Sequence, residues 1–341
     1  MSDRPLRILT ITNMWPEKGN FRGTFVFEQV ESIRALGHHV DVEVIAQSRG
    51  RRDYFLAPPR VRRRFKQGNY DLVHIHFGMS AWAGRFVGRG VPRVLTLHGG
   101  DVYIWWQRWL TKLGDGGTTK IYTSRRQARS AGEPDALVIA CGVNPDLFVP
   151  MDQTAARREL GIDHDEPIVL FGALRENPIK DYPLFVSVLE ELRRRGQTVH
   201  ELILAEFHQP RTRIPVKFAA ADALLLTSKS ETGPLVVKEA VLTGLPVVSV
   251  DVGDVPDVLD GVTPSAWVPW PDRWGTPAAR AQLVTALADE LEKILATRQR
   301  STGREAKERI HLQTSARAVE AVYRQVLAQR SATATSPARP R

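Results

Sequence analysis

The chain has 341 residues, of which 43% are hydrophobic and 25% charged, and its formal net charge at pH 7 is +9. This length and composition predict about two globular domains, and no apolar run approaches the ~20 residues that a membrane-spanning helix needs. Because Cys141 is the single cysteine and the first residues lack a signal-peptide layout, we expect a cytoplasmic protein without an intrachain disulfide.

Short apolar runs alternate with helical patterns over the first 150 residues. Strands are predicted at LRILTI, HHVDVEVIA, YDLVHIHF, RVLTLHG, KIYTS and ALVIACG, and a helix at GTFVFEQVESIRALG. Alternation of this kind predicts a parallel sheet with helices on both faces, because buried parallel strands are continuous apolar runs.

A second α/β pattern starts after a polar pause near residue 150. It contains the expected strands PIVLFGAL, HELILAEF, DALLLTS and PVVSVDVG, and the expected helices YPLFVSVLEELRRRG and PLVVKEAVLTG. We predict one domain over 1–150 and another over 151–311, with ligands in a cleft that faces the carboxyl ends of both sheets. Residues 276–330 are predicted to be mostly helical, and 331–341 to be a disordered tail.

Residues 49–66 carry eight basic residues and one acidic residue. Two interpretations stay open: a solvated helix face or loop, and a surface that meets anionic lipid or a phosphorylated acceptor, as a protein peripheral to the inner face of the membrane would have. Each basic residue near an anionic membrane contributes ~1 kcal/mol. The chain has no zinc-finger spacing, RNA-recognition signature or basic zipper, so we expect no nucleic-acid partner.

One predicted helix carries a carboxylate among apolar residues. Pro234 suits its first position, with Gly233 as the cap, and residues 235–242 are nearly all apolar except for Glu239 and Lys238. A buried carboxylate is costly without a partner, and the adjacent lysine points elsewhere. Glu239 therefore binds the two hydroxyls of a nucleotide ribose, or it forms an ion pair that the sequence does not reveal.

The loop before this helix has the features of a phosphate site. It contains Glu231, followed by Thr232, Gly233, Pro234 and Leu235. Free amides at a helix start bind pyrophosphate, which would place Glu231 beside the sugar attached to that phosphate. The alternative is that Glu231 is a structural carboxylate bound to a backbone amide.

Seven residues separate Glu231 from Glu239, and GLPV follows at 244–247. This pattern resembles the signature of family-4 retaining glycosyltransferases. The fuller string TSKSETGPLVVKEAVLTGLPVVSVDVGDVPDVL is most similar to the branch that includes teichuronic-acid-type cell-surface polysaccharide transferases. The resemblance covers most of residues 5–330. It implies a GT-B fold, with two Rossmann-like domains facing across a cleft and a last helix, about 312–330, packing back on the acceptor-binding N-terminal domain.

Further residues acquire expected roles from their position and from the resemblance. Arg175 and Lys180 lie on a strand-to-helix loop, where two cations can hold a diphosphate and stabilise it as it leaves. The resemblance places His98 against the donor sugar and Asp101 on the acceptor side. Gly23 lets the backbone approach the donor closely.

The resemblance implies a nucleoside-diphosphate sugar as donor, UDP-linked in preference to GDP-linked, and retention of the anomeric configuration. No permanently bound cofactor and no metal are expected, because protein cations and helix amides bind the pyrophosphate. The acceptor is a glycan, a lipid-linked or a small-molecule hydroxyl, in surface-polysaccharide or natural-product assembly. Cys141 is expected to be a buried thiol without a histidine partner. The alternatives are a non-transferase GT-B enzyme, such as a sugar-nucleotide epimerase or a phosphorylase, and a non-catalytic sugar-nucleotide-binding protein.

Overall fold

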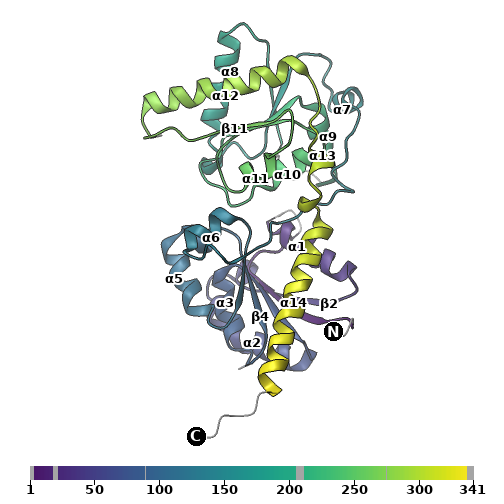
Figure 1. Ribbon diagram of the computed structural model, residues 1–341, viewed down its shortest axis with the longest axis vertical. Helices are drawn as coiled ribbons and strands as arrows, with labels where there is room; N and C mark the ends of the chain where they lie inside the picture. Colours follow the sequence, from purple (N-terminus) through teal and green to yellow (C-terminus); the bar gives the residue numbers. More distant parts are fainter. Residues whose placement is uncertain (1–3, 18–21, 89, 205–210, 274, 336–341) are drawn as a thin grey trace. The chain divides into compact units, whose positions relative to one another are not determined.

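The computed structural model describes residues 4–17, 22–88, 90–204, 211–273 and 275–335. The chain divides into unit 1, which comprises residues 1–142 and 312–341, and unit 2, which comprises residues 143–311 (Figure 1). Each unit is built on a parallel β-sheet with helices packed against it, so the predicted α/β class is confirmed. In the part of the chain that is described, no helix combines the length and the apolar character needed to cross a bilayer.

Unit 1 contains a six-stranded sheet in the order β2-β1-β3-β4-β5-β6. Its strands are β1 Arg7–Thr12, β2 His39–Val44, β3 Leu72–His76, β4 Arg93–Leu97, β5 Thr119–Tyr122 and β6 Leu137–Val138. Its helices are α1 Thr24–Ala35, η1 Gln47–Arg49, α2 Asp53–Gly68, α3 Gly78–Arg85, α4 Gly100–Tyr103, α5 Trp105–Gly114, α6 Arg125–Ala131 and α14 Leu312–Thr335.

Side chains of β1, β3, β4 and β5 in unit 1 divide between two separate cores. Leu9 of β1 packs with the α2 and α3 side of the sheet, whereas Ile8 packs with α1 and α14. Tyr323 and Val319 of α14 belong to this second core, so the last helix packs on the N-terminal sheet as expected. This helix continues to Thr335, into the segment expected to be disordered, and residues 336–341 lie outside the described residues.

Unit 2 contains a five-stranded parallel sheet in the order β11-β10-β9-β7-β8. Its strands are β7 Ile168–Phe171, β8 His200–Ile203, β9 Ala223–Leu226, β10 Val247–Val250 and β11 Ala266–Val268. Its helices are α7 Gln153–Glu159, η2 Pro178–Lys180, α8 Tyr182–Arg194, η3 Arg211–Arg213, α9 Ile214–Ala220, α10 Leu235–Leu242, α11 Val255–Leu259, α12 Pro277–Thr297, α13 Gly303–Ala306 and η4 Glu308–Ile310. Apolar side chains of α8, α10 and α12 pack on this sheet in one continuous core.

Two strand expectations need correction. The run ALVIACG was expected to be a buried strand, but only Leu137–Val138 pair, and both side chains are exposed. The reason is position, because β6 is an edge strand bonded to β5 alone. The short strand Ala266–Val268 was not expected from the sequence, since three residues are too few to show a pattern.

Candidate functional site

The charged residues that the sequence singled out in unit 2 follow two adjacent strands. Arg175 and Lys180 follow β7, and Glu231 follows β9. Parallel strands end at one edge of their sheet, which is where α/β sheets bind ligands. The two loops are tied together, because the Thr227 hydroxyl donates to the Lys180 carbonyl at 2.9 Å.

Lys180 and Glu231 form an ion pair at this edge. Lys180 Nζ lies 2.5 Å from Glu231 Oε1, and the two side chains are 23% and 14% exposed. The sequence assigned the lysine to the donor phosphate and the glutamate to the donor sugar. These assignments require adjacent side chains, because the bond that breaks joins the sugar to the phosphate. The geometry meets that requirement.

Arg175 faces a different partner. Its guanidinium lies 2.5 Å from Glu201 Oε1 and 5.2 Å from the centre of the Tyr182 ring. The Tyr182 hydroxyl also donates to Glu201, at 2.7 Å. In this structure Arg175 and Lys180 are therefore paired with different carboxylates, Glu201 and Glu231. An ion pair as exposed as that of Arg175, whose side chain is 47% exposed, contributes only ~0–1 kcal/mol, so a bound diphosphate can compete with it.

Glu239 is buried on α10, and it has a protein partner. Arg211 Nη2 donates to Glu239 Oε1 at 2.9 Å, and the Arg211 guanidinium lies 5.3 Å from the centre of the Phe148 ring. The ion pair that the sequence left open is therefore present. Sequence reasoning missed Arg211 because it lies 28 residues before Glu239 and belongs to no motif. A carboxylate has about four lone-pair sites, so one carboxylate can accept from several donors at once.

Helix α10 begins one residue later than expected. Pro234 is the N-cap rather than the first helical residue, because its ψ of 112° is extended, and the helix starts at Leu235. The expected cap, Gly233, is therefore one position too early. A Cβ on Gly233 would lie 3.0 Å from Asp254 Oδ2, so this loop passes close to the residue that precedes α11.

A buried ion pair holds the loop before α10 close to the residues that precede α11. Lys238 on α10 is fully buried, and its Nζ lies 2.8 Å from Asp254 Oδ2. The neighbouring Gly253 has φ +56°, and a Cβ there would lie 2.8 Å from the Thr232 carbonyl oxygen. The sequence signal for Asp254 was a lysine in an otherwise apolar helix, which needs a carboxylate partner somewhere in the fold.

In unit 1, His98 follows β4 and contacts two further polar side chains. Its Nε2 lies 3.0 Å from Nδ1 of His76, which ends the adjacent strand β3. Its Nδ1 lies 3.9 Å from the Cys141 sulfur, and Cys141 is half-buried. The expectation of a buried thiol without a histidine partner is therefore wrong. The two residues are 43 positions apart, so no local sequence pattern indicates their proximity.

His98 belongs to a cluster of three histidines. His74 lies 2.6 Å from the Tyr323 hydroxyl and 2.8 Å from the Thr96 hydroxyl, and its ring is 4.2 Å from that of His76. Burial lowers the pKa of His74 to about 3, and burial with repulsion from His74 lowers the pKa of His98 to about 3. Burial and its histidine neighbours also hold the pKa of His76 well below its usual range. All three rings are neutral at pH 7, so His98 has one ring N–H to donate.

Asp101 holds the turn that carries His98. Its carboxylate accepts from the backbone amides of Gly99 at 2.7 Å, His98 at 3.1 Å and Gly78 at 3.2 Å. Burial raises the pKa of Asp101, and these amides oppose the shift. The structure thus uses Asp101 to position the turn after β4.

Gly23 lies at the start of α1, in the loop after β1. Its φ is +84°, and a Cβ there would lie 2.5 Å from the Met14 carbonyl carbon. The glycine therefore allows the loop to fold back against the helix start.

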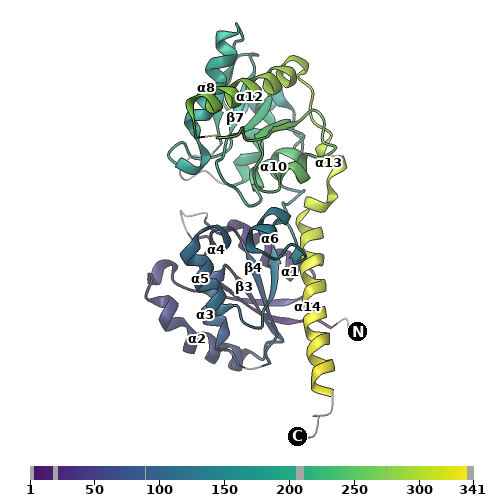
Figure 2. The ribbon, with the colours of Figure 1, turned by 60° about the vertical axis from the view of Figure 1, so that its left-hand side comes forward.

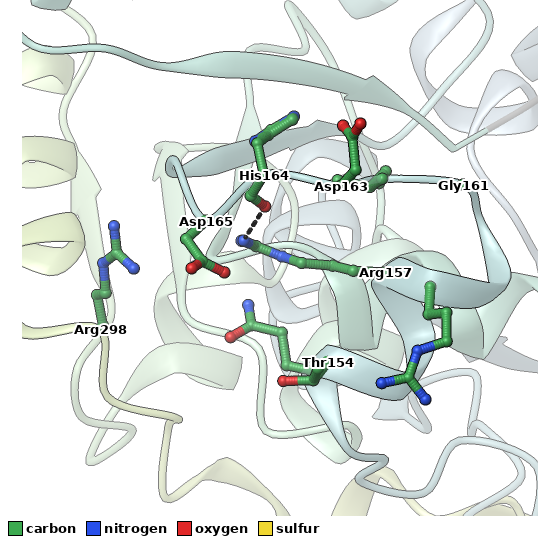
Figure 3. A pocket seen from close by; sticks show the side chains of 10 residues that line it. Thr154, Arg157, Gly161, Asp163, His164, Asp165 and Arg298 are labelled. Atoms are coloured by element: carbon green, nitrogen blue, oxygen red, sulfur yellow. Dashed lines mark hydrogen bonds between the residues drawn. The ribbon is translucent and has the colours of Figure 1, made fainter.

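A hollow of about 470 Å³ in unit 2 lies elsewhere, between α7 and the loop before β7 (Figure 3). Arg157 in its wall donates to the His164 carbonyl at 3.1 Å and pairs with Asp222 at 2.7 Å, so this cation is used by the fold. Near it, His164, Glu166 and His200 have ligand atoms within 4.8 Å of one another. These residues precede or begin strands, so they lie at the sheet edge opposite Lys180 and Glu231.

Comparison with known families finds similarity to glycosyltransferases in both units. Residues 20–147 match the model of Glycosyltransferase Family 4, and residues 166–296 match the model of Glycosyl transferases group 1. Each match covers less than half of the chain, and together they extend over most of both units.

Two curated proteins are similar to this chain at low identity. D-inositol 3-phosphate glycosyltransferase of Segniliparus rotundus is 27% identical over 274 residues, which cover 64% of this chain and 59% of that protein. The putative teichuronic acid biosynthesis glycosyltransferase TuaC of Bacillus subtilis is 27% identical over 216 residues, which cover 54% of each. The chain thus spans little more than half the length of these relatives.

Solved structures share the fold. Sucrose-phosphate synthase from Thermosynechococcus elongatus superposes with a TM-score of 0.71 at 19% identity, covering 95% of this chain and 100% of the other. Anabaena HepE in complex with UDP-glucose superposes with a TM-score of 0.60 at 18% identity, covering 97% and 100%. At these identities the likeness concerns the fold alone.

Proposed function

We propose that this protein is a retaining glycosyltransferase that moves a sugar from a nucleoside-diphosphate sugar to a hydroxyl group of an acceptor. The donor is UDP-linked in preference to GDP-linked, in line with the UDP-glucose complex of the Anabaena neighbour. The acceptor is a glycan, a lipid-linked or a small-molecule hydroxyl. The observation that carries the proposal is the contact between Lys180 and Glu231 at the sheet edge before α10.

Unit 2 supplies the donor contacts in this proposal. Glu239 accepts the ribose hydroxyls, while Arg211 offsets the cost of burying its carboxylate. The amides at the start of α10, beyond Thr232 and Gly233, bind the pyrophosphate together with the positive end of the helix dipole. Arg175 leaves Glu201 to reach the same phosphates.

The reaction breaks the bond between the anomeric carbon and the phosphate oxygen and forms a bond from that carbon to the acceptor oxygen. The acceptor proton passes to the leaving phosphate oxygen on the same face, which preserves the anomeric configuration. Lys180, Arg175 and the α10 amides stabilise the charge that develops on the phosphate. Glu231 orients the sugar, and no metal takes part in these steps.

Unit 1 contributes to sugar and acceptor binding in this proposal. The neutral ring of His98 keeps its contact with His76, and its Nδ1 exchanges the longer contact with Cys141 for a hydrogen bond with a sugar hydroxyl. Asp101 acts through His98 by fixing the turn that carries it, and Gly23 shapes the loop after β1.

The test is thermal unfolding of the full chain with UDP, GDP and their sugar conjugates. A ligand at 100 times its Kd stabilises the protein by ~2.7 kcal/mol, which raises the Tm by roughly 5–10 °C. We expect UDP to stabilise the wild type and to have little effect on Glu239→Gln. Glu190→Gln, an exposed carboxylate on α8, is the matched control and should respond as the wild type does. Absence of a shift with every nucleotide would refute the donor assignment.

A further inference from the structure

The outer face of α5 carries exposed aromatic side chains. Trp105 is 81% exposed, Trp109 59% and Trp106 41%, and Tyr103 and Ile104, just before the helix, are each 40% exposed. Tryptophan offers one of the largest apolar surfaces of any residue. Leaving three of them in water on one helix is unfavourable unless something covers them.

The packing of α5 on α3 fixes the direction of this face. A Cβ on Gly78 would lie 1.9 Å from the Thr111 hydroxyl, and one on Gly114 would lie 2.7 Å from the Trp82 amide nitrogen. The two backbones approach closely at these small residues. The side of α5 that bears Thr111 and Gly114 is therefore buried, and the tryptophans cannot turn inward.

The exposed apolar surface continues onto α3. Trp82 and Phe86 are 36% and 41% exposed, and their rings meet edge to face with centroids 5.1 Å apart. Arg85 donates to the carbonyl of Leu113 at the end of α5, and Leu113 is also 41% exposed. We call these residues together the aromatic face: Trp82, Phe86, Tyr103, Ile104, Trp105, Trp106, Trp109 and Leu113.

Helix α2 adds exposed cations beside the aromatic face. Figures 1 and 2 show α2 next to α3, and α3 next to α5. Of the eight basic residues of 49–66, three pair with Glu43 or Asp53: Arg49, Arg60 and Arg64. The other five are exposed: Arg51, Arg52, Arg62, Arg63 and Lys66. Phe55 and Leu56 on the same helix are 77% and 65% exposed.

We propose that the aromatic face and the exposed cations of α2 dock the protein on an anionic lipid surface. Tryptophan and tyrosine prefer the headgroup level of a bilayer, and amphipathic helices with such residues lie in the interface plane. Arginine and lysine near the surface are attracted to anionic lipid, in keeping with the net charge of +9. The docking surface does not depend on the proposed donor chemistry.

The composition of this surface favours lipid over the other occupants. The centre of a protein interface is depleted in charged residues, whereas here five exposed cations lie on or just before α2, which packs on α3. A sugar acceptor stacks on one or two rings, whereas this face runs over two helices. The experiment below distinguishes a protein partner and a sugar acceptor from lipid.

The experiment is co-sedimentation of the full chain with phosphatidylcholine vesicles, with and without phosphatidylglycerol, in the absence of nucleotide. We expect binding to the anionic vesicles that weakens as salt is added. We expect two double variants, Trp105→Ser/Trp109→Ser and Arg62→Gln/Arg63→Gln, to lose affinity for the anionic vesicles. Each loss should be about tenfold or more. Trp267→Ser, a 43% exposed tryptophan in unit 2, is the matched control and should bind as the wild type does.

Quenching of the wild-type tryptophan fluorescence by brominated lipid tests insertion without any substitution, so the proposal stays testable if a variant fails to fold. Absence of quenching would overturn it, as would double variants that bind like the wild type. Dissociation of an oligomer by the tryptophan substitutions, without vesicles, would instead identify an interface between copies. Weaker turnover of a soluble acceptor with unchanged vesicle binding would identify an acceptor platform and overturn the lipid assignment.

Discussion

Single residues of unit 2 balance burial against ionic pairing in different ways. Lys238 and Asp254 are both buried, so removing either partner would leave an uncompensated charge inside the protein. Lys180 and Glu231 are half-buried at the sheet edge, where each can exchange its partner for a ligand group. The first pair therefore maintains the loop, while the second is suited to binding.

We expect Lys180→Met to lower turnover far more than stability. Loss of a cation that stabilises the leaving phosphate costs on the order of 10²–10³ in kcat, by analogy with removal of one oxyanion donor. The measurement is UDP release from the sugar nucleotide that stabilises the wild type. Lys229→Met, an exposed lysine on the β9 loop, is the control and should keep nearly full activity. A Lys180→Met enzyme with wild-type kcat would exclude the lysine from the reaction.

At the scale of elements, the start of α1 depends on one glycine. Gly23 combines a left-handed φ with a backbone approach that leaves no room for a Cβ. Gly132, which follows α6, has the same φ of +84° but nothing within 4 Å of its Cβ position. Substitutions at the two positions therefore distinguish the free-energy cost of the left-handed backbone from the cost of the steric clash.

We therefore expect Gly23→Ala to destabilise the protein more than Gly132→Ala does. The left-handed conformation alone costs an alanine roughly 1–2 kcal/mol, and the collision with Met14 adds to this at position 23. Urea unfolding of both variants measures the difference. Equal losses of stability would mean that the loop after β1 moves aside at no cost. Gly23 would then be required only for its left-handed backbone conformation.

The sequence predicted most elements because their patterns are local. Buried strands such as β7 and β9 are continuous apolar runs, and the amphipathic or buried helices have clear ends. What it missed depends on contacts between distant positions: Arg211 with Glu239, Cys141 with His98, and the edge position of β6. The aromatic face was missed for a related reason, since a tryptophan-rich helix reads as core until its neighbours show which side is buried.

At the scale of the whole molecule, the C-terminal helix completes unit 1. Tyr323 on α14 lies 2.6 Å from His74 Nδ1, 249 residues earlier in the chain. This contact links the last helix to the middle of the sheet, next to the strand end that bears His76. The stability of unit 1 therefore depends on a polar cluster that must remain uncharged.

This cluster predicts that stability falls as the pH drops below about 6.5. In the unfolded chain, each histidine takes up a proton near its usual pKa of about 6.5. In the folded protein, the pKa values of His74 and His98 are lowered to about 3, and that of His76 is held well below its usual range. The unfolded state thus binds more protons below about pH 6.5, so the free energy of unfolding decreases with falling pH. Three such histidines give a slope of about 4 kcal/mol per pH unit, fully developed below about pH 5.5.

The measurement is urea unfolding of the wild type between pH 5 and pH 7, where most carboxylates remain ionised. Because the slope counts protons, His76→Asn should remove about a third of it, whatever the variant does to stability at pH 7. His39→Asn, which replaces an exposed histidine at the start of β2 outside the cluster, is the control and should keep the full slope. If His76→Asn left the slope unchanged, then His76 would protonate in the folded protein, and the ring against which His98 packs would carry a charge in mild acid.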